Sequence, residues 1–133
     1  MDDITMKIYQ AIIDNKEIME HVPKNNIKFF DYPNAQEIKD IVIVIDPLGQ
    51  DSPTNYGDDS PIAFEDLYQI DVFVKQNKNI NARLIAKNIS FEISKALRLV
   101  NIYDTGSSIK PEYIKDFNIY RQIKRFEAKQ SIV

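Results

Sequence analysis

The chain has 133 residues, of which 44% are hydrophobic and 28% charged, with a net charge of −3 and no cysteine. This composition is typical of one globular domain, and it excludes a disordered chain, a disulfide framework, a thiolate nucleophile and a zinc–cysteine site. No apolar run approaches the roughly 18 residues of a membrane span, and the acidic start lacks the positive charge of a signal peptide. We therefore expect a single domain over 1–133, cytosolic as made, with no membrane partner.

The charge is distributed unevenly along the chain. Residues 1–39 carry seven acids and five bases, residues 40–74 carry eight acids and no base, and residues 75–133 carry five acids and twelve bases. One interpretation is two solvated faces of opposite sign. The other is a surface that meets a copy of itself head to tail, with an acidic patch on a basic one. The overall acidity argues against simple binding of duplex DNA.

The first half of the chain predicts one helix and two strands. Apolar residues at three- and four-residue spacing predict a helix over 3–20, which Pro23 ends. A short strand over 27–32 follows. The run 41–45 is continuously β-branched, which is typical of a central strand covered on both faces.

Residues 47–62 are predicted to form a long acidic loop, because prolines, glycines and aspartates are concentrated there. Its acid density suggests calcium, but counting from Asp51 the third position is Pro53 and no glutamate stands at the twelfth. We expect instead a loop that contacts a partner. Tyr56 is either an interface anchor or packs on its own scaffold. On the acidic side, the candidates for a subunit interface or a pore lining are Asp51, Tyr56, Asp58, Asp59, Glu65 and Asp66.

The second half predicts a strand over 63–76, a helix over 80–99, and strands over 100–103 and 117–128. Residues 129–133 are expected to form a frayed tail. Along the strand 63–76, alternation assigns four apolar side chains to the core: Tyr68, Ile70, Val72 and Val74. The basic candidates for a subunit interface are Arg83, Lys87, Arg121, Lys124 and Arg125.

The predicted order is α-β-β-β-α-β-β. Neighbouring strands joined directly are expected to be antiparallel. The prediction is an α+β fold with a mostly antiparallel sheet of four to five strands and two helices packed on one face.

One motif suggests a catalytic site. Asp104-Thr105-Gly106-Ser107 follows an apolar strand and is similar to the active-site turn of aspartic proteases, which a short chain would complete as a dimer. The chain has only three glycines, which leaves little for a flap, so we interpret the motif as a turn. His21 is the only histidine and is assigned to the surface. We predict no catalytic, metal or cofactor-binding residues and no cofactor.

The chain as a whole resembles the tail terminator, or tail-completion, family of long-tailed bacteriophages of Gram-positive hosts. The resemblance rests on the opening helix, the strand 41–45, the acidic loop, the strand 68–74, the basic helix 82–97 and the closing strand 120–126. It implies a non-enzymatic structural protein of the virion tail, assembled in the host cytoplasm. The implied partners are other copies in a hexameric ring, the major tail tube protein and the head–tail connector, with DNA passing through the lumen.

Alternatives remain open at this point. One is a head-side stopper or head–tail joining protein, another is a dimeric aspartic protease that uses Asp104, and a third is a small bacterial interaction module. Within the ring, the acidic loop would face either the basic surface of a neighbour or the DNA path.

Overall fold

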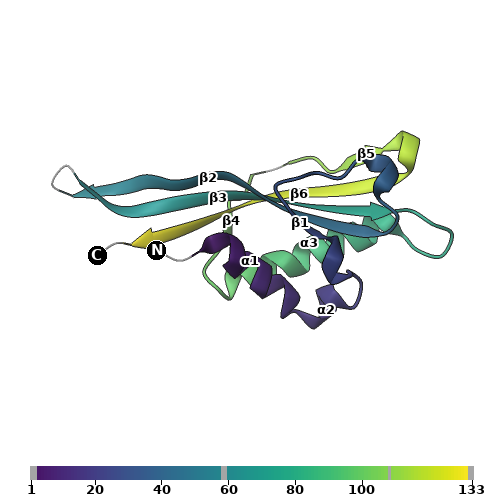
Figure 1. Ribbon diagram of the computed structural model, residues 1–133, viewed down its shortest axis with the longest axis horizontal. Helices are drawn as coiled ribbons and strands as arrows, with labels where there is room; N and C mark the ends of the chain where they lie inside the picture. The colour runs from purple at the N-terminus through teal and green to yellow at the C-terminus, as the bar shows by residue number, and fades with distance from the viewer. Residues whose placement is uncertain (1–2, 58–59, 108, 132–133) are drawn as a thin grey trace.

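The computed structural model describes the backbone of residues 3–57, 60–107 and 109–131, and the side chains of 3–49, 65–107 and 109–129. Within these residues a mixed, mostly antiparallel sheet of six strands carries helices on one face (Figure 1). The predicted α+β class is confirmed, although the sheet has one strand more than expected. The strands are β1 (Ile27–Phe29), β2 (Ile41–Gly57), β3 (Ser60–Lys75), β4 (Tyr103–Asp104), β5 (Glu112–Ile114) and β6 (Ile119–Ser131).

The helical layer consists of α1 (Ile4–Ile13), α2 (Lys16–Met19) and α3 (Ala82–Arg98). The prediction for α3 is confirmed, and the Asn81 side chain caps its start by accepting from the Leu84 N–H. The single helix predicted over 3–20 is wrong. The Asn15 side chain accepts from the Ile18 N–H at 3.0 Å and caps α2, which starts as a new helix.

The main core lies between the helices and one face of the sheet. Even-numbered residues of β3 between 68 and 74 and odd-numbered residues of β2 between 41 and 45 point into it, and the four residues predicted from alternation are all buried there. Along α3 the buried side chains recur on one stripe, which includes Ala82, Ile89, Ile93 and Leu97. This face therefore follows the ordinary pairing of an apolar helix stripe with an apolar sheet face.

A second, smaller apolar cluster covers the opposite face. It consists of Ile38, Val42, Val44, Phe73 and Ile119. The segments 30–40, which contains η2 (Ala35–Glu37), and 114–117, which includes η3 (Lys115–Phe117), supply its cover. The continuous apolar run 41–45 is thus buried on both faces, as the sequence predicted.

The expected loop over 47–62 is contradicted by the structure. β2 continues to Gly57 and β3 begins at Ser60, so the two strands form one long hairpin that extends past the helices (Figure 1). Two register shifts, between Pro47 and Gly49 and between Gly49 and Ser52, accommodate the turn-forming residues within the ladder. We call residues 47–57 and 60–66 the arm. Pro47 and Pro53 are tolerated because β2 is an edge strand along the arm.

Other expectations are also corrected. β1 and β2 are parallel, because residues 30–40 are long enough to carry the chain across the open face and back. Residues 129–131 belong to β6 rather than to a frayed tail, because they pair with residues 63–65 of β3. The strand predicted over 100–103 is the short β4 at Tyr103–Asp104, since the C-terminal cap of α3 and its following turn occupy 99–101.

Candidate functional site

The predicted acidic residues lie along the arm and its base. Asp51 and Tyr56 are on the β2 side of the arm, and Asp58 and Asp59 lie outside the described residues. Glu65 and Asp66 are at the base, on β3. Glu65 is half-buried, but Asp66 is 4% exposed, so its carboxylate is not part of a free acidic surface.

The predicted basic residues do not form one surface. Arg83 and Lys87 are exposed on α3. On β6, Arg121 and Arg125 point to the open face of the sheet, whereas Lys124 points to the helical side and donates to Ser94 Oγ on α3 at 3.0 Å. Because the basic β6 pairs directly with the acidic β3, part of the charge contrast in the sequence is neutralised within one molecule.

Sequence reasoning missed a buried ion pair on the open face. The Asp71 carboxylate is fully buried, and Arg121 donates to it through Nε, with an Nε–Oδ2 distance of 2.6 Å, and through Nη2. The guanidinium also lies 5.6 Å from the ring centre of Tyr32 and 5.1 Å from that of Phe73. An arginine that is bonded through two nitrogens and stacked on two rings is held in one geometry.

A small polar network extends from this pair to the surface. Gln69 donates to Asp71 Oδ1 at 3.0 Å, and Arg125 Nε donates to Gln69 Oε1 at 3.2 Å. The Tyr32 hydroxyl donates to Asp46 Oδ2 at 2.9 Å. Among the described residues, every buried side-chain nitrogen or oxygen has a hydrogen-bond partner, so the network is satisfied internally.

Burial dominates the electrostatics of this cluster. Desolvation raises the pKa of Asp71, and the Arg121 guanidinium and the Gln69 amide act against that increase. Desolvation also raises the pKa of the Tyr32 phenol well above its usual range, and the carboxylates of Asp71 and Asp46 raise it further. Tyr32 therefore stays a neutral donor at physiological pH. The cluster holds the segment 30–40 on the sheet, and it offers no open position for a substrate.

A signal for this pair was present in the sequence. Asp71 is an acid within an apolar strand, next to Phe73 on the same face, and Arg121 occupies the matching part of the closing strand. Alternation assigns only the other face of this strand to the core, and we predicted no cover for the face of Asp71. The crossover of residues 30–40, together with residues 114–117, buries that face.

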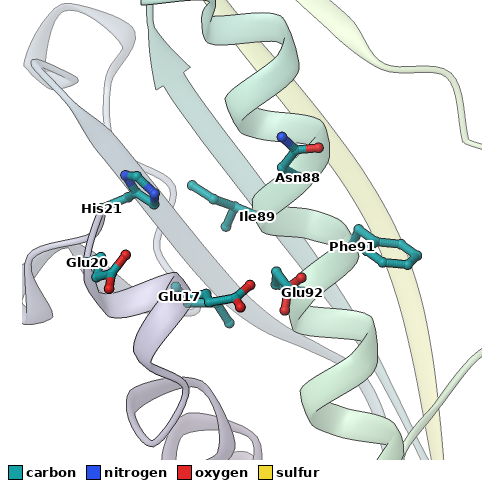
Figure 2. A pocket seen from close by; sticks show the side chains of 8 residues that line it. Glu17, Glu20, His21, Asn88, Ile89, Phe91 and Glu92 are labelled. Carbon is teal, nitrogen blue, oxygen red and sulfur yellow. The ribbon is translucent and has the colours of Figure 1, made fainter.

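An acidic cleft of about 510 Å³ lies between α2 and α3 (Figure 2). Glu17, Glu20 and His21 face it from the α2 side, and Glu92 faces it from α3. Within the described residues, no three His, Asp or Glu side chains converge closely enough to hold a metal ion. His21 is exposed at the rim, as expected from its surface assignment.

A basic groove of about 310 Å³ lies on the other flank of α3, toward β6. Its lining combines an exposed aromatic ring with three cations and one carboxylate: Phe91, Ser94, Lys95, Arg98, Asp104 and Lys124. Phe91 lines both hollows, and in Figure 2 its ring lies on the side of α3 away from Glu17, Glu20 and His21. α3 therefore separates two flanks of opposite charge.

The Asp104-Thr105-Gly106 motif forms a turn. Asp104 Oδ1 accepts from the Gly106 N–H at 2.8 Å, and Gly106 has φ +78°, a conformation that favours glycine. Asp104 Oδ2 is 3.8 Å from Lys124 Nζ. The carboxylate is thus used in the turn and on the rim of the basic groove.

Neither comparison with known proteins identifies a family. The sequence matches no known family, and it has no significant match among curated proteins. Among the described residues, no helix is long and apolar enough to cross a membrane.

Proposed function

We propose that this protein is a structural subunit of a phage tail, a tail terminator that forms a hexameric ring on the end of the tail tube. The ring would end polymerisation of the tube and join it to the head connector, and DNA would pass through its lumen. The family resemblance supports this role, which places the protein in the virion tail after assembly in the host cytoplasm.

The arm is the observation that carries the proposal. It extends the sheet past the helical layer (Figure 1). Among the described residues, no strand pairs with the outer edge of β2 beyond Ile45, or with the outer edge of β6 beyond Glu127. Long open edges of this kind are ordinarily protected in soluble proteins, and assembly is one way to cover them.

The charge pattern supports assembly through unlike surfaces. The arm is acidic, whereas a separate groove on the helical layer is basic. A contact between two different surfaces is heterologous, and such contacts generate rings when the rotation between neighbours closes. A ring is the assembly that the proposed function requires.

Light scattering after size-exclusion chromatography, with negative-stain images, tests the proposal. We expect rings, either alone or after addition of the tail tube protein, and tubes of limited length with capped ends. A strict monomer that leaves tube growth unchanged would contradict it. Pull-down against tail tube and connector proteins separates a terminator, which binds the tube, from a head-side stopper, which binds the connector alone.

A further inference from the structure

The basic groove between α3 and β6 has more positive charge than its own neighbours neutralise. Lys95 Nζ lies 3.3 Å from Glu92 Oε1, and Lys124 Nζ lies 3.8 Å from Asp104 Oδ2. Arg98 is exposed and forms no ion pair with any described residue. These contacts are long or solvent-exposed, so they leave the cations available to a partner at little cost.

An exposed aromatic ring stands on the rim of the groove. Phe91 is 58% exposed, and Lys95 Nζ is 5.7 Å from its ring centre. Aromatic and arginine side chains around a concave surface are typical of the residues that supply most of the affinity in protein interfaces. Lys95 and Arg98 are favoured near the end of α3 because they complement the negative end of the helix dipole. That effect does not explain why Phe91 and Lys124 lie beside them.

The arm has the complementary chemistry. Residues 47–66 hold no Lys or Arg and five acids, of which Asp66 is buried. The arm also projects, whereas the groove is concave. Within one molecule the arm continues the sheet away from the helical layer, so it cannot turn back onto its own α3 (Figure 1).

We propose that the groove between α3 and β6 receives the acidic arm of a neighbouring copy. This inference rests on the proposed function, because it names the contact that joins one ring subunit to the next. The arm of each subunit lies against Phe91, Lys95 and Arg98 of the next, in a heterologous contact. The other flank of α3 is excluded as the receiving surface, since Glu17, Glu20 and Glu92 there would repel an acidic arm.

Charge reversal with rescue tests the contact. Lys95→Glu with Arg98→Glu reverses the groove, and Asp51→Lys with Glu65→Lys reverses the arm. We expect each double variant to raise the dissociation constant for self-association by about tenfold or more, and their combination in one chain to restore it to within about threefold. Analytical ultracentrifugation over a concentration series gives these constants, and circular dichroism checks that each variant is folded.

Two matched variants make the test specific. Lys24→Glu with Lys78→Glu makes the same charge change at exposed positions that do not line the groove, and it is expected to assemble like the wild type. Arg83→Glu with Lys87→Glu changes α3 itself outside the groove. If this pair disrupts assembly and the groove pair does not, the inference is overturned.

A cysteine cross-link provides a direct readout. The chain has no cysteine of its own, so single cysteines at Arg98 and at Asp51 report only their own contact. Mixing Arg98→Cys with Asp51→Cys under mild oxidation should give a disulfide-linked dimer, and Arg83→Cys with Asp51→Cys should not. Equal yields from both mixtures would overturn the inference.

The inference and the proposed function fail in different ways. A wild type that forms rings but tolerates reversal of the groove overturns the inference and leaves the function standing. A wild type that associates through the groove but never caps tail tubes overturns the function alone. A wild type that stays monomeric with and without tail tube protein overturns both.

Discussion

Both faces of the sheet are buried, but by different kinds of contact. The helical face is sealed by aliphatic and aromatic side chains from α1, α2 and α3. The open face has a smaller apolar cluster and a buried ion pair, covered by an irregular segment and a few residues near β5. The difference teaches that a regular helix can be held by apolar area alone, whereas a short irregular cover is fixed in place by directional polar contacts.

The helical face should respond most strongly to loss of volume. Leu97→Ala removes a fully buried side chain from the end of α3 and is expected to lower the free energy of unfolding by about 3–4 kcal/mol. Leu99→Ala, two residues further along and 86% exposed, is the control and should change it by less than about 0.5 kcal/mol. Urea denaturation measures both. Equal losses for the two variants would show that the helix end is packed differently.

On the open face, the ion pair should matter more than the apolar cluster. Arg121→Met leaves the Asp71 carboxylate buried without its cation, and we expect a loss of about 3 kcal/mol at pH 7. Arg125→Met removes an equal charge from the same strand, where the side chain is exposed, and is expected to cost less than about 0.5 kcal/mol. Similar losses for both would mean that Asp71 is hydrated in solution.

Tyr32 should show a smaller effect. Tyr32→Phe keeps the ring against Arg121 and Phe73 but removes the hydroxyl that donates to Asp46. The expected cost is about 1 kcal/mol, the usual net contribution of one hydrogen bond. Tyr103→Phe, which removes an exposed hydroxyl bonded to Asn101, is the comparison and should be close to neutral. A loss well above that of one hydrogen bond would indicate that the hydroxyl fixes the whole segment 30–40.

The smallest expected effect is a pH dependence. Because the folded-state pKa of Asp71 is raised, its contribution to stability is fully present below the unfolded-state pKa, and it is lost as the pH rises through the folded-state pKa. Asp71→Asn removes this dependence. The free energy of unfolding of the variant, relative to that of the wild type, should therefore be higher at pH 7 than at pH 4 in parallel urea titrations. The opposite trend would show that Arg121 lowers the Asp71 pKa by more than burial raises it.

Periodicity was a good guide where one physical requirement dominates. The buried stripe of α3 and the inward residues of β3 were predictable because both depend only on which side chains avoid water. The arm was not predictable in this way. Its prolines and glycines are turn signals by local chemistry, yet pairing along β2 and β3 overrides them, and register shifts accommodate the exceptions.

The sequence predicted the charge of the candidate surfaces but not where their side chains lie. The acidic segment and the basic segment were visible as counts, but strand alternation sends Lys124 and Arg121 to opposite faces of β6. Arg121, a candidate for a subunit interface, forms an ion pair with Asp71 within the same chain. A linear sequence cannot reveal that, because the cover over Asp71 comes from residues 30–40, which lie far from both partners along the chain.

The crossover of residues 30–40 has a consequence for the order in which the chain can fold. It leaves the ribosome before the residues that it covers, which include Phe73, Ile119 and Arg121, because all three follow it in the chain. Contacts between segments so distant in the chain form slowly, because the intervening loop must close first. The open face is therefore completed only after β6 is in place. Until then, the exposed apolar side of β2 and β3 is the part of the nascent protein most in need of a chaperone.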